Sequence, residues 1–315
     1  MNALHIESTG RYIPPKVLTN DDLSRMVDTS DEWIYPRTGI RRRHINEDLT
    51  CSQMAARAAS RALERGGTDP RDLCCLVLAT DTPDMFAPAD ACAVHAELGL
   101  PESVLAFDVS AACPGFTVAL HVARGLLMQN PGRKALVVAS ENMSSYLDWT
   151  DRSTCVLFGD GAGAAVVSLS EEGETYFEGG TREGIEALKI SADPADGPDF
   201  RVTRMKGQEV FRFAVRVLPE TIERLLADAG LELGDIDHFI FHQANMRIIR
   251  NVCHKMGIPE EKCYCDIEEY GNTSAASSAI VLSEMDERGL LERGDTVVMV
   301  CFGAGLSYEG ILFDW

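Results

Sequence analysis

The feature that most limits how this chain can fold is a sequence block that occurs once in each half. The segment Leu98-Gly-Leu-Pro-Glu102 recurs 158 residues later as Met256-Gly-Ile-Pro-Glu260. Apolar runs of similar sequence, Leu136–Ala139 and Val297–Val300, follow the two blocks at nearly the same spacing. A single long period predicts two similar halves related by a pseudo-two-fold axis, because a solenoid would show several short repeats.

Within both halves, short apolar runs alternate with segments of helical periodicity. The runs predict buried strands at Cys74–Thr80, Val104–Val109, Ala135–Ser140, Ala164–Leu169, His238–Phe241 and Thr296–Val300. The periodic segments predict helices at Cys51–Arg65, Ala89–Leu98, Thr117–Met128, Val210–Ala229, Met246–Met256 and Ala275–Arg288. This alternation predicts an α/β fold of parallel sheets covered by helices, with an N-terminal half at residues 1–170 and a C-terminal half at 171–315. Ligands bind such folds at the carboxyl ends of the strands.

The composition excludes several classes of function. The 315 residues are 45% hydrophobic and 25% charged, as in folded enzymes. The formal charge of −20 disfavours nucleic acid or an anionic membrane as the main partner. No run of about 18 apolar residues is present that could span a membrane, and the first residues lack the features of a signal peptide, so we expect a cytoplasmic protein.

Neither a metal site nor a disulfide scaffold is expected. The ten cysteines lie mostly within apolar runs and no Cys-x-x-Cys pair occurs, which predicts reduced thiols rather than disulfides or a zinc ribbon. The seven histidines are scattered, and none is spaced from a carboxylate as metal ligands are. The sequence therefore predicts no metal and no bound cofactor.

Cys113 and a glycine-rich turn are the first candidates for chemistry. Cys113 follows the strand predicted at Val104–Val109 and directly precedes Pro114, a residue well suited to the start of a helix. Unpaired amides and the positive end of the helix dipole stabilise a thiolate at such a place, so the setting favours a nucleophile over an inert core cysteine. The turn Gly303-Ala304-Gly305 follows the last strand and could bring backbone amides close to a ligand, as an oxyanion hole requires.

Two further candidates lie in the second half of the chain. His242 comes just after the strand predicted at His238–Phe241, and the duplication puts it in the same crevice as Cys113. The segment Gly271-Asn-Thr-Ser274 lies where Cys113 lies in the first half. By itself the segment is typical of a turn with a helix cap, but the repeat places the Asn272 amide across the pseudo-two-fold axis from the thiol.

Ordered motifs along nearly the whole chain point to one family. They are Asp31-Glu-Trp33-Ile, Arg37-Thr-Gly-Ile-Arg41, the Cys113 segment, Thr150-Asp-Arg152, Phe158-Gly-Asp-Gly-Ala-Gly163, His242-Gln-Ala-Asn245, Gly271-Asn-Thr-Ser274 and the terminal glycine-rich turn. In this order they resemble the motifs of the β-ketoacyl-[acyl-carrier-protein] synthase III family. The resemblance implies a duplicated thiolase-like fold, an αβαβα sandwich of two halves.

The resemblance also implies a two-step condensation that starts type II fatty acid synthesis. Cys113 would take the acyl group of an acyl-CoA primer, acetyl-CoA or another short acyl-CoA, as a covalent thioester. Malonyl-[acyl-carrier protein] would then lose carbon dioxide, and its carbanion would attack the acyl-Cys113. His242 and Asn272 would stabilise the enolate as hydrogen-bond donors, and the backbone amides of Cys113 and Ala304 would form the oxyanion hole.

Binding residues follow from the same resemblance. Trp33 and Arg152 would clasp the adenine of coenzyme A, and Arg37 would lie near its phosphates. Phe86 matches a residue that, in relatives, reaches across a dimer to form the floor of the acyl pocket. A homodimer is therefore implied, and a bulky side chain at this place favours a short primer.

A basic stripe offers a docking site for the acidic carrier protein, although the whole chain is acidic. Residues 238–259 contain no Asp or Glu, and Arg247 and Arg250 fall on one face of the helix predicted there. Arg247 corresponds to the docking arginine of the family, and Arg212 and Lys255 match two supporting positions. We expect the carrier protein to dock on these four cations.

Three alternatives stay open, and two positions depart from the family pattern. A biosynthetic thiolase would use Cys301 as a second catalytic cysteine, but it would also need a histidine in place of Asn272. A relative from secondary metabolism could carry identical motifs while transferring the acyl group to another nucleophile or condensing an unusual starter. A protein that only binds acyl-CoA or the carrier would need no nucleophile.

Pro114 stands where a small residue is usual, and Ala304 interrupts a run of glycines.

Overall fold

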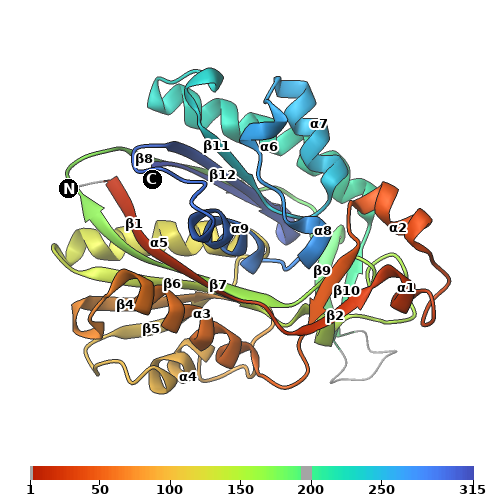
Figure 1. The fold of residues 1–315 in the computed structure, drawn as a ribbon, viewed down its shortest axis with the longest axis horizontal. Helices are drawn as coiled ribbons and strands as arrows, with labels where there is room; N and C mark the ends of the chain where they lie inside the picture. Colours follow the sequence, from red (N-terminus) through yellow and green to blue (C-terminus); the bar gives the residue numbers. More distant parts are fainter. Residues whose placement is uncertain (1–2, 193–200) are drawn as a thin grey trace.

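The chain folds into five alternating layers of helix and sheet (Figure 1). The computed structural model describes residues 3–192 and 201–315. In Figure 1 the layers run from a layer of helices at the bottom, through a sheet, a central layer of helices and a second sheet, to a layer of helices at the top. These helices are α3 (Cys51–Gly66) and α4 (Asp90–Glu97), α5 (Gly115–Gln129) and α9 (Ala276–Glu287), and α6 (Gly207–Ala229) and α7 (Met246–Met256). The duplicated αβαβα fold expected from the sequence is confirmed.

The first sheet has its strands in the order β1-β7-β6-β4-β5. Their bounds are β1 Ala3–Tyr12, β4 Leu73–Ala79, β5 Leu105–Val109, β6 Lys134–Glu141 and β7 Gly161–Ser170. β4 runs parallel to β5 and to β6, whereas β7 runs antiparallel to β1 and to β6. The carboxyl ends of β4, β5 and β6 therefore meet at one edge of this sheet.

The second sheet repeats this order as β8-β13-β12-β11. Its strands are β8 Thr175–Thr181, β11 His238–Phe241, β12 Thr296–Gly303 and β13 Ser307–Asp314. An isolated parallel bridge between Phe239 and Cys263 takes the place of a fifth strand. β7 of the first sheet ends at Ser170, and β8 of the second sheet begins at Thr175. We therefore propose residues 1–170 and 171–315 as the two halves.

The expectation of parallel sheets is wrong for the outer strands. Only β11 and β12 are parallel in the second sheet, while β13 is antiparallel to β12 and to β8. Only three residues lie between β12 and β13, a connection too short for the helical crossover that parallel strands need. β1, β8 and β13 are absent from the sequence prediction because polar residues such as Glu7 and Glu309 interrupt their apolar runs.

The predicted elements are otherwise found where the sequence pattern places them. The strand at His238–Phe241 and the helix at Met246–Met256 have the predicted bounds, and the others differ by a few residues at their ends. Smaller elements complete the structure: β2 Lys16–Thr19, α1 Asn20–Leu23, α2 Asp31–Thr38, β3 Arg42–Ile45, η1 Pro70–Asp72, η2 Met143–Tyr146, β9 Leu188–Ala192, β10 Arg201–Met205, η3 Leu233–Asp235, η4 Glu260–Lys262, α8 Ile267–Tyr270 and η5 Ala304–Leu306. None of the helices in the described ranges has the length and apolar character needed to cross a membrane.

Small residues let the two central helices pack closely between the sheets. A Cβ added to Gly163 of β7 would lie 2.5 Å from the Cβ of Ala279 in α9, so only glycine fits there. A Cβ at Gly115, the first residue of α5, would lie 3.1 Å from the Cβ of Ala275, which directly precedes α9. The amino ends of α5 and α9 are therefore neighbours, and the residues that precede each helix are brought together.

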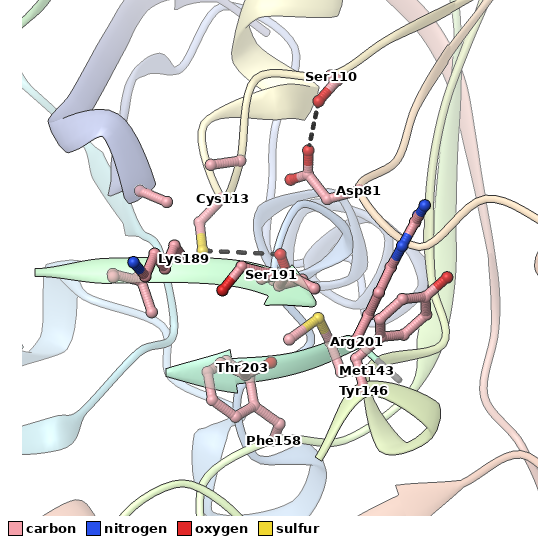
Figure 2. Close-up of a pocket in the computed structure, with 15 residues that line it drawn as sticks. Asp81, Ser110, Cys113, Met143, Tyr146, Phe158, Lys189, Ser191, Arg201 and Thr203 are labelled. Atoms are coloured by element: carbon pink, nitrogen blue, oxygen red, sulfur yellow. Dashed lines mark hydrogen bonds between the residues drawn. The ribbon is translucent and has the colours of Figure 1, made fainter. Parts of the chain in front are cut away.

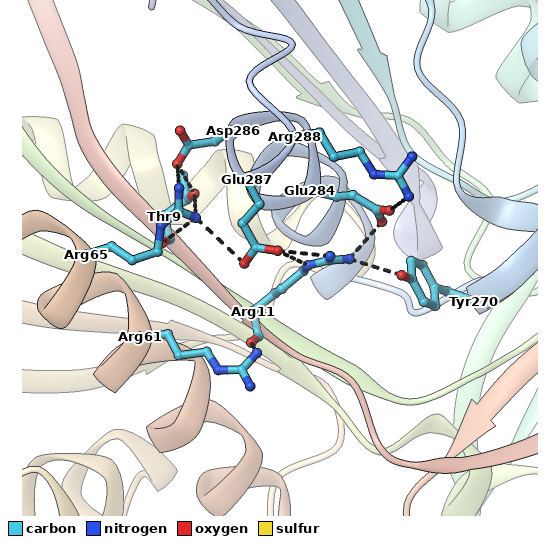
Figure 3. Close-up of polar contacts among 9 residues, drawn as sticks. All are labelled: Thr9, Arg11, Arg61, Arg65, Tyr270, Glu284, Asp286, Glu287 and Arg288. Atoms are coloured by element: carbon cyan, nitrogen blue, oxygen red, sulfur yellow. Dashed lines mark hydrogen bonds and ion pairs between the residues drawn. The ribbon is translucent and has the colours of Figure 1, made fainter.

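A cluster of charged side chains joins the two halves beside α9 (Figure 3). Arg11 of β1 binds Glu284 of α9 at 2.7 Å, Glu287 at 2.9 Å and the Tyr270 hydroxyl at 3.0 Å. The Glu284 side chain is only 3% exposed and also pairs with Arg288. This cluster fixes α9 against the first sheet, although its carboxylates lie far along the chain from Arg11.

Candidate active site

The nucleophile candidate lies in a strained turn between β5 and α5. Ala112 adopts a positive φ of 55°, and its carbonyl accepts a hydrogen bond from the Gly115 N–H at 2.8 Å. Non-glycine residues hold such a conformation only where the surroundings impose it, and such places cluster at functional sites. Cys113 follows directly, and its sulfur borders a cavity of about 440 Å³ (Figure 2).

The Cys113 thiol is held in its neutral form. Burial raises its pKa above the ordinary range, and the carboxyl groups of Asp81 and Glu141 raise it further, while a hydrogen bond with Ser274 opposes this. The Cys113 sulfur lies 3.6 Å from the Ser274 hydroxyl oxygen. The amino end of α5 is placed as predicted, but the burial of the sulfur opposes the thiolate that we expected the helix end to favour.

His242 is buried at the end of β11 and is neutral. Desolvation lowers its pKa from 6.5 to about 3. Its Nδ1 lies 2.6 Å from the Ser277 hydroxyl, and that hydroxyl also accepts a hydrogen bond from the Gln243 N–H at 3.3 Å. A serine hydroxyl can accept this bond and still donate its own proton to Nδ1. With Nδ1 as the acceptor, the proton of the neutral ring is on Nε2, where His242 can donate it to a substrate.

The amide of Asn272 is oriented by its own turn. Its Oδ1 accepts a hydrogen bond from the Ser274 N–H at 2.9 Å, and its backbone N–H donates to the Leu157 carbonyl at 2.9 Å. An oxygen that faces an N–H cannot be exchanged with the amide nitrogen without losing that bond. The Nδ2 group is therefore the part of the side chain left to donate to a substrate.

Ser277 gives the first testable prediction, because it sets the tautomer of His242. Ser277→Ala should slow the condensation step about tenfold, since an unheld imidazole loses its fixed orientation and one hydrogen bond. The rate is measured by product formation from enzyme whose nucleophile is already acylated. Ser283→Ala is the matched control, because Ser283 lies in the same helix and its buried hydroxyl has no partner among the described residues. Condensation at the wild-type rate in Ser277→Ala would contradict this role.

The glycine-rich turn lies directly against the nucleophile. A Cβ added to Gly303 would lie 2.7 Å from the Cys113 backbone nitrogen and 2.7 Å from Pro114 Cδ, so a side chain would displace the turn. Ala304 borders the same cavity as Cys113. Among the described residues no acceptor is found for the Cys113 N–H, which leaves this donor for a substrate oxygen.

A narrow tunnel brings the three predicted catalytic residues together. A cavity of about 100 Å³ is lined by Cys113, His242 and Asn272 at once. Leu157 and Phe211 line both this tunnel and an outer groove of about 550 Å³. Cys113 thus borders both the tunnel, which shares part of its lining with the outer groove, and the cavity of about 440 Å³, which we call the inner cavity.

The predicted coenzyme A residues gather at the outer groove. The guanidinium carbons of Arg37 and Arg152 each lie 4.9 Å from the centre of the Trp33 ring. Trp33 and Arg37 line the groove, and Arg152 donates a hydrogen bond to the Asp28 carbonyl at 2.8 Å. An aromatic ring flanked by two guanidinium groups provides stacking and positive charge, which an adenine nucleotide needs.

The four predicted docking cations are exposed on α6 and α7. They are Arg212, Arg247, Arg250 and Lys255. Arg212 and Arg247 also line the outer groove, and none of the four forms an ion pair with a described residue. Asn245, whose side chain caps α7, donates a hydrogen bond to the Arg37 carbonyl at 3.1 Å, so the docking helix is joined to the groove.

Phe86 and Cys301 lie apart from this tunnel. Phe86 is 81% exposed and is not among the residues that line the cavity of about 440 Å³, although the guanidinium carbon of Arg201, which does line it, lies 3.9 Å from the Phe86 ring centre. Cys301 is buried in the core between the sheets and borders none of the cavities described above; burial raises its pKa to about 12. In residues 3–192 and 201–315 no group of three or more His, Cys, Asp or Glu side chains is placed to hold a metal ion.

Sequence reasoning missed four polar residues around the nucleophile. Ser274 contacts Cys113, and Ser277 contacts His242. Asp81 follows β4 and Glu141 ends β6, and these two strands are parallel neighbours. The carboxyl end of a strand was the signal that identified Cys113 and His242. Applied to β4 and β6, the same signal would have identified both carboxyl residues.

Comparisons with known proteins agree on one family. The profile described as 3-oxoacyl-[acyl-carrier-protein] synthase III matches residues 107–180, and the profile for the C-terminal part of the same enzyme matches residues 226–315. The chain is 42% identical to the β-ketoacyl-[acyl-carrier-protein] synthase III of Clostridium tetani, over 99% of this chain and 98% of that protein.

Solved structures give the same picture. The chain is similar to 3-oxoacyl-[acyl-carrier-protein] synthase III from Aquifex aeolicus, with a TM-score of 0.93 and 42% identity, over 99% of this chain and 100% of that one. It is also similar to the priming β-ketosynthase of the R1128 polyketide biosynthetic pathway, with a TM-score of 0.94 and 38% identity, over 99% of this chain and 96% of that one.

Proposed function

Because the chain belongs to the β-ketoacyl-[acyl-carrier-protein] synthase III family, we propose that it is the acyltransferase that starts fatty acid synthesis. It condenses an acyl-CoA primer, acetyl-CoA or another short acyl-CoA, with malonyl-[acyl-carrier protein]. The products are a 3-oxoacyl-[acyl-carrier protein], carbon dioxide and free coenzyme A. The observation that carries this proposal is the tunnel lined at once by a buried thiol and two neutral hydrogen-bond donors.

In the first step Cys113 attacks the primer. Its sulfur forms a bond to the thioester carbon, and the bond from that carbon to the coenzyme A sulfur breaks. The Cys113 N–H and the backbone amide of Ala304 suit the oxyanion of the tetrahedral intermediate, because the Gly303 turn holds both backbones together. The acyl chain then lies in the inner cavity, on the side of Cys113 away from the tunnel.

The second step uses donors rather than a base. Loss of carbon dioxide from the malonyl group leaves negative charge on the thioester oxygen, which neutral donors stabilise without taking part in proton transfer. His242 Nε2 and Asn272 Nδ2 are both available as donors, because their other polar atoms are bonded to Ser277 and to the Ser274 N–H. The carbanion attacks the acyl-Cys113 and releases the sulfur.

The outer groove and its cations bind the two carriers of the reaction. Trp33, Arg37 and Arg152 hold the nucleotide of the acyl-CoA, and the pantetheine chain passes through the tunnel. The carrier protein docks on the exposed cations of α6 and α7, where no described acidic residue neutralises them. Both substrates therefore approach Cys113 from the same side.

Docking can be tested with Arg250, which lies on α7 outside the groove lining. Arg250→Glu should raise the KM for malonyl-[acyl-carrier protein] about tenfold, because like charges oppose the approach of an acidic partner. Acylation by acyl-CoA should keep its KM. Arg71→Glu is the charge-matched control, since Arg71 is 80% exposed and lies in η1, far along the chain from α6 and α7. An equal change in both variants would rule out docking on α7.

A homodimer completes the acyl pocket in this proposal. β5 is an edge strand, so within the described residues one side of it is unpaired, and Leu105 on it is 56% exposed. Phe86, which does not line its own cavity, is free to enter that of a second copy. A cytoplasmic location fits ten cysteines that form no disulfide.

A priming synthase of a polyketide pathway is the second candidate function, because the R1128 enzyme is as similar in structure as the fatty acid enzymes. The two candidates share the site and differ in the primer and in the pathway that uses the product. A thiolase is disfavoured because Cys301 borders neither the tunnel nor the inner cavity. A protein that only binds acyl-CoA or the carrier protein is disfavoured too, because binding alone needs no nucleophile and no hydrogen-bond donors beside it, whereas Cys113, His242 and Asn272 line one tunnel.

The first experiment weighs the intact protein after incubation with acetyl-CoA and a set of longer or branched acyl-CoAs. A single acyl adduct on the wild type and none on Cys113→Ser supports the nucleophile, and the preferred acyl chain identifies the primer. Addition of malonyl-[acyl-carrier protein] should then remove the adduct and release a 3-oxoacyl product. No adduct with any acyl-CoA would overturn the proposed function.

A further inference from the structure

Two cysteine side chains are in contact beneath the docking helix α7, and the proposed mechanism uses neither of them. Cys253 lies in α7, and Cys263 directly follows η4. Their sulfur atoms are 3.3 Å apart, although the two residues lie ten positions apart along the chain. Both are free thiols in the structure. A disulfide holds its sulfur atoms about 2.05 Å apart, so an approach of about 1.2 Å is enough to join this pair.

The pair is open to a small reagent from one side. Cys253 is 4% exposed and lies on the buried face of α7, whereas Cys263 is partly exposed. A reagent that arrives from solvent therefore meets Cys263 first, with the Cys253 sulfur directly behind it. The hydrogen bond from Cys263 also lowers the pKa of Cys253, while burial opposes this shift. An accessible cysteine in contact with a second one is the arrangement found at reversible oxidation sites.

A third cysteine lies on the same side of the chain segment. Cys263 and Cys265 both pack against the hydrophobic cluster that contains the buried face of α7. Tyr264, between them, packs against the core between the two sheets. The side chains alternate as they do in an extended segment, so Cys265 shares the surroundings of Cys263. Cys263 is the one whose sulfur contacts Cys253, which makes Cys265 a matched control.

Cys263 is fixed to the second sheet. It forms an isolated parallel bridge with Phe239 of β11, and its N–H donates to the Glu260 carbonyl at 3.0 Å. The ammonium group of the preceding Lys262 donates to the Gly234 carbonyl at 3.2 Å. Because these bonds hold the segment, closing the gap between the sulfur atoms has to draw α7 towards the sheet.

A movement of Cys253 is passed on to the docking cations. The Cys253 carbonyl accepts hydrogen bonds from the Gly257 N–H and from the Ile258 N–H, the latter at 2.9 Å, and these bonds end α7. Lys255 lies within this last turn, and Arg250 lies one turn earlier on the exposed face. A displacement of Cys253 towards the sheet therefore carries both cations away from a partner that docks on α7.

We propose that Cys253 and Cys263 are oxidised to a disulfide by hydroperoxides such as hydrogen peroxide, and that this disulfide weakens docking of the carrier protein. One sulfur of the pair, as a thiolate, attacks a peroxide oxygen; the O–O bond breaks, giving a sulfenic acid and, with a proton, one water. The other thiol attacks the sulfenic sulfur. The S–S bond forms, the S–O bond breaks, and the oxygen leaves with the thiol proton as a second water. The two cysteines are oxidised and the peroxide is reduced.

The effect on docking rests on the proposed function, whereas the disulfide can be detected without it. The test uses Cys113→Ser, so that the nucleophile is not a second target of the oxidant. After treatment with hydrogen peroxide, digestion without reductant should release the Cys253 and Cys263 peptides joined by a disulfide. The Kd for malonyl-[acyl-carrier protein] should rise about fivefold, because cations moved from the interface attract the acidic partner less. A dithiol reductant should restore both the free thiols and the original Kd.

Two further variants, made in the Cys113→Ser background, separate this disulfide from general oxidation. Cys265→Ser should still form the disulfide and show the same rise in Kd. Cys263→Ser should bind the carrier protein equally well before and after peroxide. Absence of the joined peptides would overturn the inference, and so would a disulfide that leaves the Kd unchanged; both would leave the proposed function intact. Reduced protein that does not bind the carrier protein would instead overturn the proposed docking on α7, and its regulation with it.

Discussion

Asn272→Ala and His242→Ala are expected to lower the rate of condensation by about 10²- to 10³-fold each, the usual cost of removing one donor from an oxyanion site. In the proposed mechanism both groups stabilise charge that develops only when the malonyl group loses carbon dioxide, so acylation of Cys113 should stay within a few-fold of the wild type. The two half-reactions are measured separately, acylation by intact mass and decarboxylation by release of labelled carbon dioxide from the malonyl group.

The sharpest control for this prediction is Asn272→Asp. The substitution keeps the size and shape of the side chain but removes the Nδ2 donor, so it should impair condensation as strongly as Asn272→Ala. Titration of His242 should cause no inflection near pH 6.5 in a plot of condensation rate against pH. Burial lowers the pKa of His242 to about 3, so the ring stays neutral across the working range. Efficient condensation by Asn272→Asp, or an equal loss of acylation in His242→Ala, would contradict the assignment of these residues to the second step.

Arg11→Ala is expected to lower the free energy of unfolding by about 3 kcal/mol, because it leaves a buried carboxylate without its main partner. Arg11 binds Glu284 and Glu287 of α9, and Glu284 has almost no access to water. Arg65 of α3 binds Asp286 and Glu287, which are more exposed than Glu284. The effect is measured as the shift in urea midpoint at fixed protein concentration. The Arg11→Ala variant should lose activity only at urea concentrations at which it unfolds.

A matched surface pair separates this effect from the removal of any arginine. Arg25→Ala removes a guanidinium that is 75% exposed and 3.0 Å from Asp22, and it should change stability by no more than about 0.5 kcal/mol. Arg11→Met combined with Glu284→Met should recover part of the loss, since no buried charge is then left unpaired. Equal destabilisation by Arg11→Ala and Arg25→Ala would show that the cluster between the halves does not hold α9.

Much of the site could be predicted from the sequence, because its residues stand where the local pattern changes. Cys113 and His242 each follow an apolar run that predicts a strand, and Asn272 was identified because the 158-residue repeat relates its segment to that of Cys113. The structure brings the three into one tunnel. β1 escaped prediction because polar residues such as Glu7 interrupt its apolar run, and its partner β7 lies far along the chain.

Local periodicity and motifs of fixed spacing were enough to predict the duplicated fold, the family, the candidate nucleophile and its two candidate donors. The protonation of the site depends on the tertiary structure. The raised pKa of the Cys113 thiol, the neutral His242 ring and the raised pKa of Glu141 all arise mainly from burial among segments that lie far apart in the chain. Burial depends on how the five layers close over each group, and no spacing within a single segment contains that information.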